Sequence, residues 1–157
     1  MPHVSETMKE ISISKEDAVF WMDANGRWHN QHGEFEHKRV IDYFNRSIGH
    51  DAEGYYVSQK RGEVIEKVYF RYQETALFVV DVLSGGDISL LLNTGKTIAL
   101  DPDSLLVRDD CLFIEMGNEL AKFNDRSMMK LSNRFEEVDG RFQIRLKDKA
   151  YFIRMAD

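Results

Sequence analysis

A chain of 157 residues with a net charge of −6 can form one compact unit or two small ones, and it is too acidic to favour duplex nucleic acid. Its longest apolar run, residues 76–80, is far shorter than a membrane span of roughly 20 residues. The single cysteine, Cys111, excludes an internal disulfide and suits a reducing compartment, so we expect a cytoplasmic protein.

The first part of the chain, residues 1–60, predicts a small unit made of a hairpin, a helix and a strand. Residues 1–14 are polar, and we expect a loose lead-in there. Two apolar arms then flank Asn25 and Gly26, a pair that suits the positive φ angles of a tight turn. Apolar residues at helical spacing follow at Val40, Ile41, Phe44 and Ile48. Gly49 is well placed to end this helix.

The second part, residues 61–157, predicts antiparallel β structure with one helix. Short apolar segments follow one another between residues 63 and 116, separated by turn sequences and without helices between them. This spacing favours an antiparallel meander that curls into a barrel or sandwich. Asn124 is a good N-cap for the helix that follows it. The chain then closes with a hairpin that turns at Lys147 and Asp148.

The two parts share an order of features: a hairpin with a glycine turn, a phenylalanine, a helix, a second glycine turn and a strand. Phe35 precedes Ile41 by the same spacing by which Phe123 precedes Met129. We interpret this as an internal duplication. We expect an α+β fold in which the N-terminal unit packs on a larger antiparallel barrel that carries the second helix and the C-terminal hairpin. A pocket is expected where the two copies face each other.

Three of the five histidines, His29, His32 and His37, lie within nine residues of one another. Their spacing resembles that of metal ligands, but zinc sites need three or four rigidly converging side chains. These three would come from a strand end, a loop and a helix start, and they do not form the HExxH pattern of a zinc helix. We expect solvated loop histidines and no cofactor, with a metal site as the weaker hypothesis.

No catalytic motif is recognisable in the sequence. Gly95, Lys96 and Thr97 imitate the end of a phosphate-binding loop, but Leu90 stands where that loop needs another glycine. The paired acidic residues fall in predicted turns or at a helix end, where water solvates their carboxylates. Motifs for a serine or cysteine nucleophile are also missing. We therefore expect that the protein is not an enzyme.

Five segments spread over residues 18–135 carry a family likeness: DANGRWHNQHGEFEHKRVIDYF, DAEGYYV, IEKV at 65–68, LNTG at 92–95, and FIEMGNELAKFNDRSMMKL. Taken in this order, they resemble the bacterial domain-of-unknown-function family 1285. The family has VEKV and TNVG at the third and fourth segments. The chain departs from the family pattern where His37 replaces an arginine near the helix start and where the segment at Gly33 lacks a proline.

The resemblance implies a duplicated α+β unit whose C-terminal part is pleckstrin-homology-like. It also implies that a nucleotide-like ligand binds between the two parts and that the protein acts in signalling or stress response. On this basis we expect a ligand-binding regulatory module. The alternative is an adaptor for protein–protein interaction without a small-molecule site, since pleckstrin-like domains also bind peptides. A hydrolase that uses the histidine cluster is a third hypothesis.

The expected ligand is a small anion, and five residues are candidates to contact it. Lys67, Asn93, Gly95 and Arg126 would supply polar contacts, with Trp28 as a stacking surface. Arg126 is a candidate because a cation at the start of a helix is unfavourable unless an anion binds to the amide groups there. A surface ion pair is the alternative explanation for Arg126.

Overall fold

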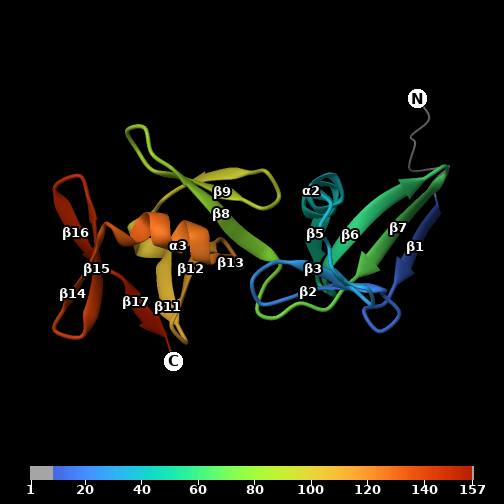
Figure 1. Ribbon diagram of the computed structural model, residues 1–157, viewed down its shortest axis with the longest axis horizontal. Helices are drawn as coiled ribbons and strands as arrows, with labels where there is room; N and C mark the ends of the chain where they lie inside the picture. The colour runs from blue at the N-terminus through green and yellow to red at the C-terminus, as the bar shows by residue number, and fades with distance from the viewer. Residues whose placement is uncertain (1–8, 157) are drawn as a thin grey trace. The chain divides into compact units, whose positions relative to one another are not determined.

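The computed structural model describes residues 9–156, which divide into two compact units, an N-terminal unit that ends at Ala76 and a C-terminal unit that begins at Leu77. Within the described residues, each unit combines one α-helix with β-sheets (Figure 1), so the expected α+β class is confirmed. The sequence had placed the boundary between residues 60 and 61. The unit extends further because strand β7 (Val64–Tyr69) pairs along its whole length with β6 (Gly54–Arg61). No helix among the described residues is long and apolar enough to cross a membrane.

The N-terminal unit is built on a four-stranded sheet in the order β1-β7-β6-β5. Its outer strands are β1 (Lys9–Ile13) and β5 (Ile48–Asp51). Strand β1 corrects the expectation of a loose lead-in up to residue 14, and residues 1–8 lie outside the described part of the chain. It runs parallel to β7 at an exposed edge. Backbone pairing rather than side-chain burial forms such a strand, so its sequence carries little apolar signal.

A smaller three-stranded sheet contains the predicted first hairpin. Its strands are β2 (Phe20–Met22), β3 (Trp28–Asn30) and β4 (Gly33–Glu34). Gly26 has a φ of +78° in the turn between β2 and β3, which confirms the position of the predicted turn. Asn25 does not have the positive φ angle that was expected for it. The backbone N–H of Met22 donates to the carbonyl of Arg71 at 2.9 Å, which ties this sheet to the segment after β7.

The core of the N-terminal unit is an aromatic cluster around Trp28, which is 1% exposed. The indole ring meets the rings of Phe20, Phe44 and Phe70 edge to face, with centroids 5.8, 5.2 and 4.8 Å away. The indole N–H donates to the side-chain oxygen of Asn45 at 2.7 Å. This cluster joins the three-stranded sheet to helix α2 (Lys38–Arg46) and to the end of β7.

Helix α2 ends earlier than predicted. Ser47 is its C-cap, and Ile48 already belongs to β5. Gly49 does not end the helix; it leaves room for a ring on the paired strand. A Cβ atom at Gly49 would lie 2.4 Å from Cζ of Tyr56, so only glycine fits there without displacing that ring.

The C-terminal unit is built on a seven-stranded sheet in the order β10-β9-β8-β13-β12-β11-β17. The strands are β8 (Leu77–Leu83), β9 (Ser89–Leu92), β10 (Thr97–Ala99), β11 (Leu105–Arg108), β12 (Cys111–Met116), β13 (Glu119–Phe123) and β17 (Arg154–Ala156). A short 3-10 helix, η1 (Pro102–Ser104), precedes β11. Neighbouring strands are antiparallel except for β13 with β8 and β11 with β17. The sheet is therefore mixed, and among the described residues it stays open with β10 and β17 at its edges, where an antiparallel barrel was expected.

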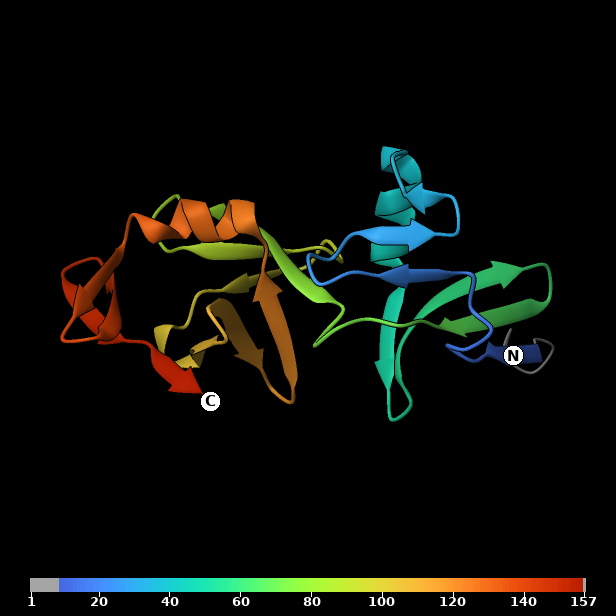
Figure 2. The same ribbon diagram turned by 60° about the horizontal axis from the view of Figure 1, so that its bottom comes forward.

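Helix α3 (Asp125–Ser132) lies against β8 and β13 of this sheet (Figure 2). The side chain of Asn124 accepts the backbone N–H of Ser127 at 2.9 Å, which confirms the predicted N-cap. Ser127 is fully buried, and its hydroxyl donates to the carbonyl of Val79 in β8 at 2.7 Å. The backbone N–H of Asn124 donates to the same carbonyl at 3.1 Å, so two hydrogen bonds attach the start of α3 to β8.

A three-stranded sheet completes the C-terminal unit, with β14 (Phe135–Val138), β15 (Arg141–Leu146) and β16 (Lys149–Phe152). Lys147 has a φ of +55° between β15 and β16, as the predicted hairpin turn requires. Both units therefore contain a hairpin, a helix and a second hairpin in the same order. The internal duplication stays a prediction, and the two helices pack differently: α3 buries Ser127 and Leu131, whereas α2 has no fully buried residue.

The two tryptophans test this account of the N-terminal core. Trp28→Ala should lower the free energy of unfolding by about 3–5 kcal/mol, because it removes a buried ring and leaves the Asn45 side chain without its donor. Trp21→Ala, at a side chain that is 41% exposed, should cost less than about 1 kcal/mol. Urea denaturation followed by circular dichroism measures both. Equal costs would contradict the assignment of Trp28 to the core.

Candidate functional site

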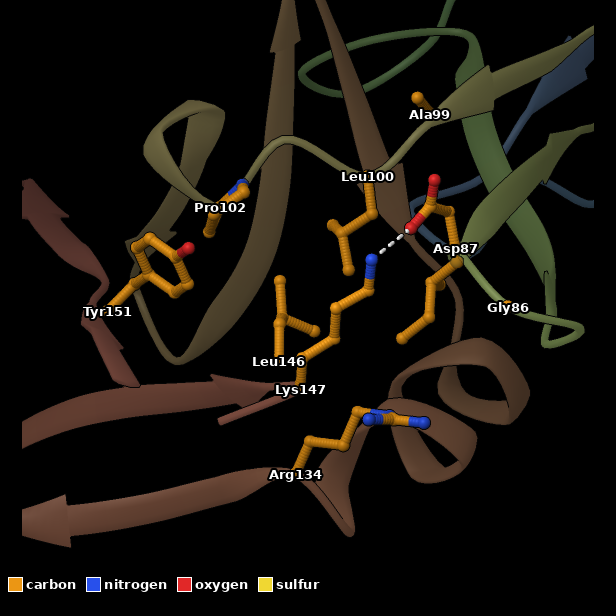
Figure 3. Close-up of a pocket in the computed structure, with 10 residues that line it drawn as sticks. Gly86, Asp87, Ala99, Leu100, Pro102, Arg134, Leu146, Lys147 and Tyr151 are labelled. Atoms are coloured by element: carbon orange, nitrogen blue, oxygen red, sulfur yellow. Dashed lines mark ion pairs between the residues drawn. The ribbon is translucent and has the colours of Figure 1, made fainter. Parts of the chain in front are cut away.

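The C-terminal unit contains a pocket of about 310 Å³, which we call the C-terminal pocket (Figure 3). Its walls come from the β8–β9 turn, the segment from β10 to η1, and the three-stranded sheet. The larger apolar side chains that line it are Ile88, Leu100, Pro102 and Leu146, and the polar ones are Asp87, Arg134, Lys147 and Tyr151. The pocket thus combines an apolar wall with two cations and one carboxylate.

An ion pair joins the two turns at the edge of the C-terminal pocket. The ammonium group of Lys147, on the β15–β16 turn, lies 2.9 Å from a carboxylate oxygen of Asp87, on the β8–β9 turn (Figure 3). The hydrogen bond from Lys147 lowers the pKa of Asp87, and the Asp87 carboxylate raises the pKa of Lys147. Both side chains are largely exposed, so the pair contributes little to stability, and another anion can compete with Asp87 for Lys147.

Arg134 is the second cation of the C-terminal pocket, and its backbone is held on both sides. Its N–H donates to the carbonyl of Leu131 at 3.0 Å, and its carbonyl accepts the N–H of Arg145 at 2.8 Å. Figure 3 shows its guanidinium apart from the pair of Asp87 and Lys147. Within residues 9–156, no carboxylate lies within ion-pair distance of Arg134. A guanidinium that is half-buried beside an apolar pocket and lacks such a partner can take an anionic ligand.

Two of the five residues proposed from the sequence belong to the N-terminal unit. Trp28 lies in the core with its N–H bonded to Asn45, so it offers no ring face to a ligand in this structure. Lys67 lies over the ring of Tyr56, 4.7 Å from its centroid, and its ammonium is 3.4 Å from a carboxylate oxygen of Glu10. Burial lowers the pKa of Lys67, but Tyr56 and Glu10 outweigh this effect and raise it.

The other three proposed residues lie in the C-terminal unit, and none of them lines the C-terminal pocket. The Asn93 side chain accepts the N–H of Phe78 at 3.0 Å, and Gly95 occupies the β9–β10 turn with a φ of +94°. Arg126 is exposed on the first turn of α3. The structure gives Trp28, Lys67, Asn93 and Gly95 contacts or conformations that serve the fold, and the role of all five in ligand binding stays a prediction.

Sequence analysis missed Arg134 because nothing local distinguishes it. A basic residue just after a helix is common, since it suits the negative end of the helix dipole. The apolar side chains around Arg134 come from strands and turns that are distant in sequence. Only the packing of the two sheets of this unit brings them together.

The three clustered histidines do not converge. His29 pairs through Nε2 with Asp23 at 2.7 Å, and its ring lies parallel to that of Trp21 with the centroids 5.9 Å apart. His32 is exposed, and its Nε2 lies 3.5 Å from the side-chain amide nitrogen of Gln31. His37 is the N-cap residue of α2 but makes no capping bond with its side chain. Across residues 9–156, no three side chains of His, Cys, Asp or Glu are placed to hold a metal ion.

Two solved structures have a similar fold. A crystal structure of a DUF1285 family protein from Silicibacter pomeroyi DSS-3 gives a TM-score of 0.64, covering 98% of this chain and 87% of that chain at 15% identity. One from Shewanella baltica OS155 gives 0.53, covering 75% of this chain and 93% of that chain at 14% identity. No family model and no curated protein matches the chain. The resemblance stated from the sequence is thus confirmed at the level of the fold.

The carboxylate of Asp23 should make the stability of the N-terminal unit depend on pH. Burial raises its pKa, but hydrogen bonds from His29 and from the backbone of Arg27 and Asn25 outweigh burial and lower it below 3.8. A lowered pKa stabilises the folded state above the unfolded value, and this contribution disappears as the pH falls through the folded value. Asp23→Asn keeps an oxygen for both backbone donors but removes the charge.

We therefore expect wild type to be more stable than Asp23→Asn at neutral pH, with a difference that shrinks as the pH falls below 3.8. Urea denaturation at a series of pH values measures this difference. A gap that stays constant down to the acid limit would show that the Asp23 charge does not stabilise the fold.

Proposed function

We propose that this protein is a ligand-binding regulatory module that holds a small organic anion in the C-terminal pocket. The observation that carries the proposal is Arg134, whose guanidinium lies beside an apolar pocket without a carboxylate partner in the described part of the chain. A carboxylate or phosphate can accept two parallel hydrogen bonds from a guanidinium. Lys147 can add a second contact when the ligand replaces Asp87.

The walls of the C-terminal pocket define the rest of the ligand. Ile88, Leu100 and Leu146 can cover an apolar body, and the Tyr151 hydroxyl can orient it. A volume of about 310 Å³ lies at the small end of the range for ligand pockets. The class is therefore a small anion with an apolar or aromatic part. A nucleotide-like ligand, as expected from the sequence resemblance, falls within this class.

Binding rather than catalysis is favoured by the groups at hand. The described residues that line the C-terminal pocket include no serine, cysteine or histidine. Its carboxylate, Asp87, and its amine, Lys147, are largely exposed and paired with each other, so neither is placed as a buried general base or nucleophile. A ligand that contacts Arg134 and Lys147 would connect the end of α3 with the β15–β16 turn. It would also release the β8–β9 turn, which carries Asp87, from Lys147. Such a rearrangement of exposed turns is a suitable output for a cytoplasmic module in signalling or stress response.

Arg134→Gln tests the site directly. In a thermal-shift screen of nucleoside monophosphates and aromatic carboxylates, a ligand at 100 times its dissociation constant adds about 2.7 kcal/mol of apparent stability. We expect Arg134→Gln to remove that gain, because the substitution deletes the charge that pairs with the anion.

Arg126→Gln is the matched control, since Arg126 is an exposed arginine of the same unit that does not line the pocket. It should leave the gain in stability unchanged. The opposite result, with loss in Arg126→Gln and none in Arg134→Gln, would move the site to the start of α3 as the sequence suggested.

The alternative function, an adaptor for another protein, has one observation in its favour. Helix α2 exposes Val40 by 41% and Tyr43 by 44% on neighbouring turns. If this surface binds a protein, Val40→Glu combined with Tyr43→Glu should abolish co-purification of a specific partner while leaving thermal stability unchanged. A partner that binds the double variant as well as wild type would exclude α2 as the docking surface.

A further inference from the structure

We infer that the N-terminal unit contains a second, separate binding site, formed around Trp21, for a planar aromatic carboxylate. A pocket of about 730 Å³ lies there, which we call the N-terminal pocket. The side chains that matter for the argument are Trp21, Tyr72, Lys15, Arg71 and Glu53. All of them belong to the N-terminal unit, so this site does not depend on the C-terminal pocket.

The aromatic part of the N-terminal pocket is held in place before any ligand binds. Trp21 is 41% exposed, and its ring lies parallel to the imidazole of His29 with an interplanar angle of 7°. The hydrogen bond between His29 and Asp23, at 2.7 Å, fixes that imidazole. A ring that is already ordered loses little conformational entropy when a flat ligand packs on it. The other tryptophan, Trp28, is buried and cannot serve this purpose.

Arg71 supplies the charge next to Trp21. A parallel β-bridge pairs Trp21 with Arg71, and the carbonyl of Arg71 accepts the N–H of Met22 at 2.9 Å. The guanidinium of Arg71 donates from Nη1 to the carbonyl of Lys15 at 3.2 Å. This bond uses one of the five N–H donors of an arginine and brings the two cationic residues together.

Neither cation is neutralised within the described part of the chain. Among residues 9–156, no carboxylate lies within ion-pair distance of Arg71 or Lys15. Glu53 is the one carboxylate among the described residues that line the pocket. Two cations beside one carboxylate leave a local positive charge in a protein whose net charge is −6. A local positive charge of this kind attracts anions.

These groups together select the ligand. The exposed indole and the Tyr72 ring suit a flat aromatic body, and the guanidinium suits a carboxylate. Glu53 disfavours ligands with several negative charges, because each additional charge meets like charge at the wall. A planar aromatic ligand with a single carboxylate satisfies all of these groups.

Nuclear magnetic resonance can test this site with the full-length protein. The chain has two tryptophans, so a 15N-labelled sample gives two indole N–H signals, and Trp21→Phe identifies which one belongs to Trp21. We use 2-naphthoate as the probe, 2-naphthamide as its uncharged counterpart and cyclohexanecarboxylate as its non-aromatic counterpart. The expected result is a saturable shift of the Trp21 signal with 2-naphthoate, a constant Trp28 signal, and much weaker effects of the other two compounds.

Substitutions of single arginines then test whether Arg71 supplies the positive charge that binds the carboxylate of the probe. Arg71→Gln should weaken binding of 2-naphthoate about tenfold, the loss expected for one hydrogen bond to a charged group. Arg39→Gln, at an exposed position on α2 outside the pocket, should bind like wild type. Arg134→Gln, in the other unit, should also leave the Trp21 shift unchanged.

The site would be overturned by any of three results. These are no shift of the Trp21 signal up to the solubility limit of 2-naphthoate, equal binding of 2-naphthamide, and unchanged affinity in Arg71→Gln. A shift that is lost only in Arg134→Gln would also overturn it, because it would place the probe in the C-terminal pocket.

Discussion

An indole ring can be buried at low cost only if its N–H finds an acceptor, and this requirement organises the N-terminal unit. Asn45 on α2 accepts the N–H of Trp28 on β3, and Phe20 and Phe44 pack on the same ring. Helix α2 has no fully buried residue of its own, and this bond and these ring contacts connect it to the sheet. The hairpin around Trp28 then presents the neighbouring Trp21 at the surface, because successive side chains of a strand point to opposite faces.

The C-terminal unit attaches its helix in a different way. Ser127 is buried, and its hydroxyl shares the carbonyl of Val79 with the backbone N–H of Asn124, so polar contacts rather than an aromatic cluster set the start of α3. The end of the same helix places Arg134 beside the three-stranded sheet, where the bond from Arg145 holds its backbone. The polar contacts at the start of α3 and the bond from Arg145 together hold the backbone on either side of the Arg134 guanidinium.

Both pockets use the same physical arrangement in an acidic protein. Each brings together two cationic side chains and one carboxylate next to apolar or aromatic groups. The candidates chosen from the sequence were selected by local features, such as a cation at a helix start or a lysine within an apolar strand. No local sequence feature distinguishes Arg71 or Arg134. What sets them apart is that no described carboxylate lies within ion-pair distance, and this depends on the tertiary structure. This is why the sequence could suggest an anion ligand but could not single out the two arginines that line the pockets.

The sequence alone determined the α+β class and the features that depend on a few adjacent residues. These are the turn at Gly26, the N-cap at Asn124 and the hairpin turn at Lys147. The tertiary structure decided whatever depends on residues far apart in the chain: the parallel pairing of β1 with β7 and of β13 with β8, the open edges of the large sheet, and the early end of α2. Turns and caps are stabilised by side chains within a few residues of each other. Strand order and burial depend instead on which distant segments pair and pack together in the folded chain. For that reason the sequence could not distinguish the environments of Trp21 and Trp28, which are seven residues apart. Only the tertiary structure shows that Trp28 lies in the core and that Trp21 lines a pocket.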